Sequence, residues 1–161
     1  MKTKDLVKLS FYLSLFFVLD VVSNSFNLFR MPQGGVLGLG VIALMIAAYD
    51  MGWKKGLLVS LVSIILQNFV NPLYVVAFPQ LFLDYLFAFG VYGLAPLFGP
   101  VWLGVVIVNV ARFISHVLSG VLYFEAGWFA SMSYNAFYMV PTLIVSLLII
   151  PVLIYRLRLN K

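Results

Sequence analysis

The sequence contains no cysteine, one histidine and few charged residues. Of its 161 residues, 9% are charged and 64% are hydrophobic, whereas an ordinary soluble domain has about 25% charged residues. Because so few charged side chains cannot cover a water-exposed surface, we interpret the chain as an integral membrane protein. The lack of cysteine excludes disulfides and thiolate metal sites, and one histidine cannot supply a His₂Glu-type zinc centre. We therefore expect neither a metal nor a cofactor.

The first ten residues, MKTKDLVKLS, form a basic segment that precedes an apolar run, as in a signal peptide. The run continues to Val22, beyond the usual length of a signal peptide, and no A-x-A cleavage site follows it. We therefore interpret this region as a retained first span. The net charge of +5 could indicate nucleic-acid binding. However, the basic residues cluster at the ends of apolar segments, so we exclude nucleic acid as a partner.

The apolar residues are arranged in long segments that predict membrane-spanning helices. A helix needs about 20 apolar residues to cross a bilayer core of about 30 Å. The sequence therefore predicts an all-α membrane protein, a six-transmembrane-helix bundle in a lipid bilayer that forms one domain over residues 1–161. The predicted spans cover residues 6–24, 36–50, 56–71, 80–98, 101–124 and 131–155.

The basic residues indicate how the bundle is oriented. They lie before the first span, between the second and third spans, and after the sixth: Lys2, Lys4, Lys8, Lys54, Lys55, Arg156, Arg158 and Lys161. With six spans, all three clusters fall on one side of the membrane. Since the cytoplasmic side carries the excess of lysine and arginine, we expect both termini in the cytoplasm.

In this orientation, three spans bring polar side chains to a similar depth below the outer surface. Asp84 lies about one helical turn inside the fourth span, and Asn135 lies near the outer end of the sixth. His116 lies about 22 Å along a fifth span that crosses a core of about 30 Å. Because ionisable groups within a membrane are usually paired and functional, we expect these three side chains to face one pocket.

The fifth span carries a polar face that should point into the bundle, at helical spacing: Arg112, His116, Ser119 and Tyr123. Structural interpretations stay open for some of these groups. Asp84 could be solvated near the interface or pair with Arg30, and the histidine could be an ordinary core residue. For Arg112 we favour an ion pair with Asp20 over ligand contact.

The residue types indicate the kind of ligand. A carboxylate among aromatic faces attracts a cation by charge and by cation–π contact. An amide and an imidazole can pair with the donor and acceptor edge of a heterocycle. Aromatic residues gather at the same depth, although any one could belong to an interfacial belt: Tyr85, Phe87, Tyr123, Phe124, Trp128, Phe137 and Tyr138. We therefore expect a small, outward-facing pocket for a cationic, aromatic, water-soluble molecule.

Four segments together resemble the thiamine-specific S component of energy-coupling factor transporters. They are MPQGG at 31–35, FLDYLFAFG at 82–90, RFISHVLSG at 112–120 and SYNAFYMVP at 133–141. The resemblance covers nearly the whole chain. It implies a six-helix protein of the bacterial cytoplasmic membrane, with both termini in the cytoplasm, that captures thiamine from outside. It also implies two kinds of partner, a transmembrane coupling subunit and a pair of ATPase subunits.

The resemblance also implies roles for individual residues. Asp84 supplies the acidic group toward thiamine, His116 and Asn135 match the binding histidine and asparagine, and Phe124 lies where a relative carries a stacking tryptophan. Ala130 stands where a relative has a pocket tyrosine, for which Tyr134 or Tyr138 could compensate. Tyr85 and Trp128 complete the expected substrate-binding set, and residues 30–35 resemble the outer lid over the site.

The face that meets the coupling subunit is expected on the first span. S components generally carry a small-x-x-x-small motif there, which lets helix backbones approach closely. Here Ser10 and Ser14 have that spacing. The alternative is that these serines only pack within the bundle.

Three other functions were weighed. The chain could capture another small heterocycle, such as a thiamine precursor, or act alone as a small secondary transporter. An intramembrane enzyme is not expected, since Ser115 and Ser119 lack the companions of an activated nucleophile. The chain has no G-x-x-x-x-G-K-[ST] loop, so ATP hydrolysis is expected in separate partner subunits.

Overall fold

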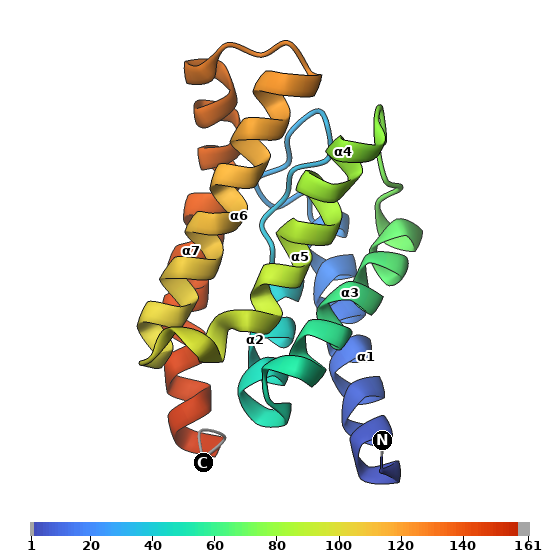
Figure 1. Cartoon of the computed structure of the whole chain (residues 1–161), viewed down its shortest axis with the longest axis vertical. Helices are drawn as coiled ribbons and strands as arrows, with labels where there is room; N and C mark the ends of the chain where they lie inside the picture. Colours follow the sequence, from blue (N-terminus) through green and yellow to red (C-terminus); the bar gives the residue numbers. More distant parts are fainter. Residues whose placement is uncertain (1, 158–161) are drawn as a thin grey trace.

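The computed structural model describes residues 2–157, which form helices joined by loops and turns, with no strand among them (Figure 1). The fourth span consists of four consecutive segments, labelled α4, η1, α5 and η2. In chain order the elements are α1 (Thr3–Ser25), α2 (Gly40–Met51), α3 (Trp53–Val70), α4 (Phe78–Leu81), η1 (Phe82–Phe87), α5 (Ala88–Gly90), η2 (Val91–Phe98), α6 (Val101–Tyr123) and α7 (Trp128–Leu157).

Five of the six predicted spans are long and apolar enough to cross a membrane, and the second is shorter. The all-helical membrane fold is therefore confirmed, but the boundary of the span predicted at 36–50 is wrong. In place of a full span, α2 has 12 residues, about 18 Å of helix. Residues 26–39 before it form a loop in which the amide of Leu37 donates to the carbonyl of Leu28. Hydropathy does not separate the two parts, because the glycine-rich loop segment is as apolar as the helix.

The short helix α2 forms the centre of the bundle. Its residues 40–49 are all buried, and α1, α3, η2 and α7 pack around it. A helix that is apolar on every side is typical of a buried element rather than one that faces water. Since α2 is enclosed by protein rather than lipid, it does not need the length of a spanning helix.

The beginning of α1, the turn between α2 and α3, and the end of α7 lie at the same end of the bundle (Figure 1). Ion pairs tie this end together. Lys8 Nζ lies 2.7 Å from an Asp50 carboxylate oxygen, and Lys55 Nζ lies 2.7 Å from Asp5 Oδ1. Arg158 and Lys161 lie outside the described residues. That this end faces the cytoplasm stays a prediction from the positive-inside rule.

The fourth span departs from the single regular helix that its apolar sequence predicts. Residues Phe82–Phe87 form a π-helix and Val91–Phe98 form a 3₁₀-helix that contains Pro96. Such segments are uncommon within helices and often lie at functional sites. At Gly93 the span touches α3 so closely that a Cβ atom there would collide with the backbone of Leu57.

We expect Gly93→Ala to lower the thermal unfolding temperature of the detergent-purified protein. The added methyl group would force the fourth span and α3 apart, and overpacking of this kind costs about 1–3 kcal/mol. Gly127→Ala is the matched control, because a Cβ at Gly127 meets no atom within 4 Å. Equal unfolding temperatures for the two variants would show that the close contact at Gly93 does not contribute to stability.

Candidate substrate-binding site

A cavity of about 280 Å³ is lined in part by the loop that precedes α2. This loop lies toward the end of the bundle opposite the termini (Figure 1). Its lining comes from α1, the 33–38 loop, the end of α3, the fourth span, α6 and α7. Ligand pockets usually have volumes of about 300–1,000 Å³. The size of this cavity therefore suits one small molecule.

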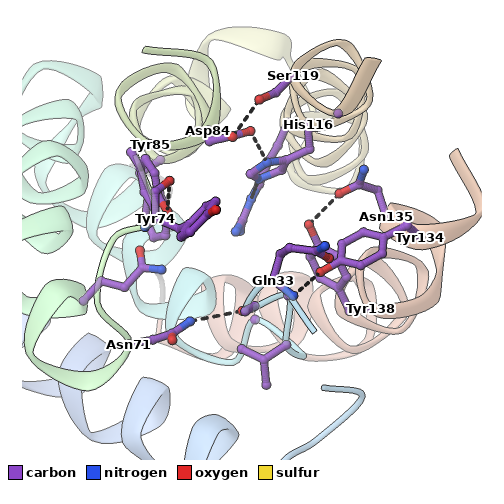
Figure 2. A pocket seen from close by; sticks show the side chains of 18 of the residues that line it. Gln33, Asn71, Tyr74, Asp84, Tyr85, His116, Ser119, Tyr134, Asn135 and Tyr138 are labelled. Carbon is purple, nitrogen blue, oxygen red and sulfur yellow. Dashed lines mark hydrogen bonds and ion pairs between the residues drawn. The ribbon is translucent and has the colours of Figure 1, made fainter. Parts of the chain in front are cut away.

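Asp84 is the centre of a hydrogen-bonded group on one wall of the cavity (Figure 2). It lies on the π-helical segment η1. One carboxylate oxygen lies 2.9 Å from His116 Nδ1. The other accepts hydrogen bonds from Ser119 Oγ and from Gln80 Nε2, both at 2.6 Å. The three hydrogen-bonding partners of the carboxylate are therefore an amide, a hydroxyl and an imidazole.

Arg112 determines which nitrogen of His116 carries the proton. Its Nε–H group donates to His116 Nε2 at 3.1 Å. Because a guanidinium is always protonated and only donates, His116 Nε2 must be the acceptor. We therefore assign the imidazole proton to Nδ1, which donates to Asp84. His116 is then neutral, so the negative charge of Asp84 remains available to a ligand.

Aromatic side chains form another part of the lining. Tyr74 and Phe124 are stacked, with ring centroids 6.0 Å apart and planes at 30°. The Tyr85 hydroxyl accepts from the Tyr74 amide at 2.9 Å. Across the cavity, Tyr138 donates to Asn135 Oδ1 at 2.7 Å (Figure 2). The site thus presents ring faces to a ligand in addition to the carboxylate.

Within the segment 30–35, which the sequence predicts to be a lid, residues 33–35 line the cavity. The backbone N–H of Gln33 donates to the Tyr134 hydroxyl at 3.0 Å, and Asn71 Nδ2 donates to the Gly34 carbonyl at 3.1 Å (Figure 2). Gly34 has φ +92, a backbone conformation that favours glycine. The loop is therefore held on two sides, by α7 and by the end of α3.

Most of the expected site residues line this one cavity, and Trp128 does not. Trp128 is the first residue of α7 and is 59% exposed. It lines a separate apolar hollow on the surface of α6 and α7, so the structure places it apart from the other expected site residues. The residues that do line the cavity are Asp84, Tyr85, His116, Phe124, Tyr134, Asn135 and Tyr138.

Two predicted ion pairs are absent among residues 2–157. Arg112 does not pair with Asp20. Instead, its Nη1 donates to the Tyr92 hydroxyl at 3.2 Å, and its guanidinium lies 4.9 Å from the centroid of the Phe89 ring. Arg30 binds the Asn27 side chain at 2.9 Å and not Asp84. The hydrogen-bonding partners of Asp84 are instead Gln80, His116 and Ser119. The sequence does not show which of the possible partners lies nearest.

Gln80 and Tyr74 are among the residues of the site that sequence reasoning missed. Gln80 is buried and binds both Asp84 and the Tyr74 carbonyl. Its position four residues before Asp84, on the same helical face, was a signal that could have identified it. Tyr74 lies in the loop between α3 and α4, where no helical periodicity indicates which way a side chain points.

The predicted partner-binding serines lie on α1, away from the cavity. Ser10 and Ser14 are both exposed, so they do not pack within the bundle. The exposed apolar residues Val7, Phe11 and Val18 lie on the same helix. This face of α1 is therefore open to lipid or to another protein.

Comparisons with known proteins give the family. Residues 6–160 match the family model described as "Thiamine transporter protein (Thia_YuaJ)". Thiamine transporter ThiT of Bacillus subtilis (strain 168) is 30% identical over 157 residues, with 83% of this chain and 81% of that protein covered. A solved structure of ThiT from Listeria monocytogenes has a TM-score of 0.77 at 19% identity, over 97% of this chain and 96% of that chain. The chain therefore belongs to the thiamine transporter protein family, whose members are transporters, and is a multi-pass protein of the cell membrane.

Proposed function

We propose that this chain captures thiamine as the S component of an energy-coupling factor transporter. The observation that carries the proposal is Asp84, a carboxylate that keeps its negative charge inside a small cavity with aromatic walls. Thiamine is a monocation with two aromatic rings. A charged acceptor beside ring faces is the combination that such a molecule requires.

The proposed roles follow from the positions of the side chains. Asp84 faces the positive charge of the ligand, and the stacked pair Tyr74 and Phe124 offers a ring face to one heterocycle. Asn135 and His116 present polar edges to the other. Because the hydrogen bonds within the protein already orient these groups, little ordering is needed when the ligand enters.

The segment 30–35 is proposed as the lid of the site. Its contacts with Tyr134 and Asn71 hold it over the cavity. For a ligand to enter by this route, both hydrogen bonds must open. We place this end of the bundle at the outer face of the membrane, because the basic clusters gather at the opposite end.

The proposed partners are a transmembrane coupling subunit and two ATPase subunits. The chain itself has no phosphate-binding loop of the G-x-x-x-x-G-K-[ST] type, so ATP hydrolysis is assigned to the partner subunits. The small exposed residues Ser10 and Ser14 on α1 are the proposed contact with the coupling subunit. Small side chains allow two membrane helices to approach closely.

We expect the purified chain to bind thiamine in a calorimetric titration, and Asp84→Asn to weaken that binding. The loss should be about 10- to 150-fold, since a hydrogen bond to a charged group contributes about 1.5–3 kcal/mol. The neutral aminopyrimidine fragment of thiamine should lose much less affinity. Calorimetry is preferable to tryptophan fluorescence, because Trp53, Trp102 and Trp128 are absent from the cavity lining.

The control for this titration is Asp50→Asn. Asp50 is also a part-buried carboxylate in a hydrogen-bonded pair, but it lies at the opposite end of the bundle with Lys8 and Tyr12. We expect this variant to bind thiamine like the wild type. Wild-type protein that shows no saturable thiamine binding would exclude the proposed function, and tighter binding of a neutral precursor would favour the other heterocycles.

We expect Ser10→Trp to block transport without affecting thiamine binding. The bulky ring would keep the coupling subunit from close approach to α1. Ser10 itself is not among the residues that line the cavity. Co-purification with the coupling subunit and ATP-driven thiamine uptake in proteoliposomes should both be lost. Leu148→Trp, at an exposed position of α7, is the control. We expect it to keep both co-purification and uptake. Uptake by the chain alone, without ATPase subunits, would favour a secondary transporter.

A further inference from the structure

One carboxylate on the wall of the cavity has no hydrogen-bonding partner. Asp20, on α1, lines the cavity and is 8% exposed. Its Oδ2 atom is buried and accepts no hydrogen bond from any residue in 2–157. Burial of an unpaired carboxylate within a membrane is strongly unfavourable. A carboxyl group in this position either takes up a proton or keeps its charge beside a compensating positive charge.

Arg112 is the cationic side chain that lines the same cavity as Asp20. Its hydrogen bonds go to neutral groups, His116 Nε2 and the Tyr92 hydroxyl, and its guanidinium lies over an aromatic ring. No ion pair joins Arg112 to Asp20 in the described part of the chain. The two side chains therefore line one cavity without a direct ion pair between them.

The number of charges around the cavity is uneven. The charged side chains among its lining residues are Asp20, Asp84 and Arg112. With His116 neutral, two negative charges and one positive charge leave a net charge of −1. A ligand with a single positive charge would neutralise the cavity.

Asp84 alone would not give the cavity a net negative charge. Arg112 is separated from Asp84 only by the imidazole of His116, which is hydrogen-bonded to both. A cation placed against Asp84 therefore also lies in the field of the guanidinium, which opposes its binding. Without Asp20, the charges of Asp84 and Arg112 would cancel and the cavity would be neutral.

We propose that Asp20 is the second carboxylate of the cation-binding site. It offsets Arg112, so that one negative charge remains for a ligand that carries one positive charge. The inference rests on the proposed function, because it takes thiamine as the cation. It assigns to α1, the helix that also carries the proposed partner contact, a direct part in selecting the charge of the ligand.

The test compares thiamine with 3-deazathiamine, a neutral isostere in which carbon replaces the thiazolium nitrogen. Calorimetry gives the affinity of each compound for the wild type, Asp20→Asn and the control Asp50→Asn. We expect Asp20→Asn to weaken thiamine about 10-fold, the effect of one nearby charge in a partly solvated site. The neutral isostere should be nearly unaffected, and the control should leave both affinities unchanged.

Retained binding of the neutral isostere also proves that the variant is folded. If Asp20→Asn binds neither compound, Asp20→Ser repeats the test with a smaller polar side chain. An equal loss of both compounds, or an unchanged ratio of their affinities, would overturn the inference. Wild-type protein that binds neither compound would overturn the proposed function as well.

A second arm tests the offset itself. Asp20→Asn combined with Arg112→Gln restores a net charge of −1, although the lost contact with His116 should weaken both compounds. We expect the preference for thiamine over 3-deazathiamine to rise above that of Asp20→Asn alone. A preference that stays at the value of the single variant would refute the offset by Arg112.

Discussion

The cavity depends on the hydrogen bonds around Asp84. Its carboxylate joins the irregular fourth span to α6, through His116 and Ser119, at a depth where water does not screen it fully. Arg112 then fixes the imidazole from below by donating to its second nitrogen. Because each group in this series of hydrogen bonds has one defined donor or acceptor role, the carboxylate is held in place without being neutralised. A polar group that is complete in this way can be buried in a bundle made almost entirely of apolar side chains.

The irregular geometry of the fourth span serves this arrangement. Gly93 lets the span approach α3 closely. The π-helical turn carries Asp84 on the side of α6, where Ser115 Oγ donates to the Leu83 carbonyl at 2.7 Å. A regular helix would satisfy its own carbonyl groups. Here a side chain of the neighbouring span donates to a carbonyl of the π-helical segment, so this segment also joins two spans.

The sequence was sufficient to predict the helical membrane fold and the meeting of Asp84, His116 and Asn135 at one cavity. Span ends and helical spacing fix both the depth and the face of such residues. Neither rule applies in loops, which is why Tyr74 was missed. Distances between helices are also not encoded in spacing, so the expected pairing of Arg112 could not be tested until the packing was known.

The short central helix has a consequence for the membrane barrier. A full second span would fill a core of about 30 Å, whereas the 12 residues of α2 fill about 18 Å. The remaining depth is left to the glycine-bearing loop and to the hollow beside it. In the proposed orientation, a molecule bound there would lie within the hydrocarbon thickness while still enclosed by protein. The remaining barrier would then be the buried apolar helix α2 rather than the lipid itself.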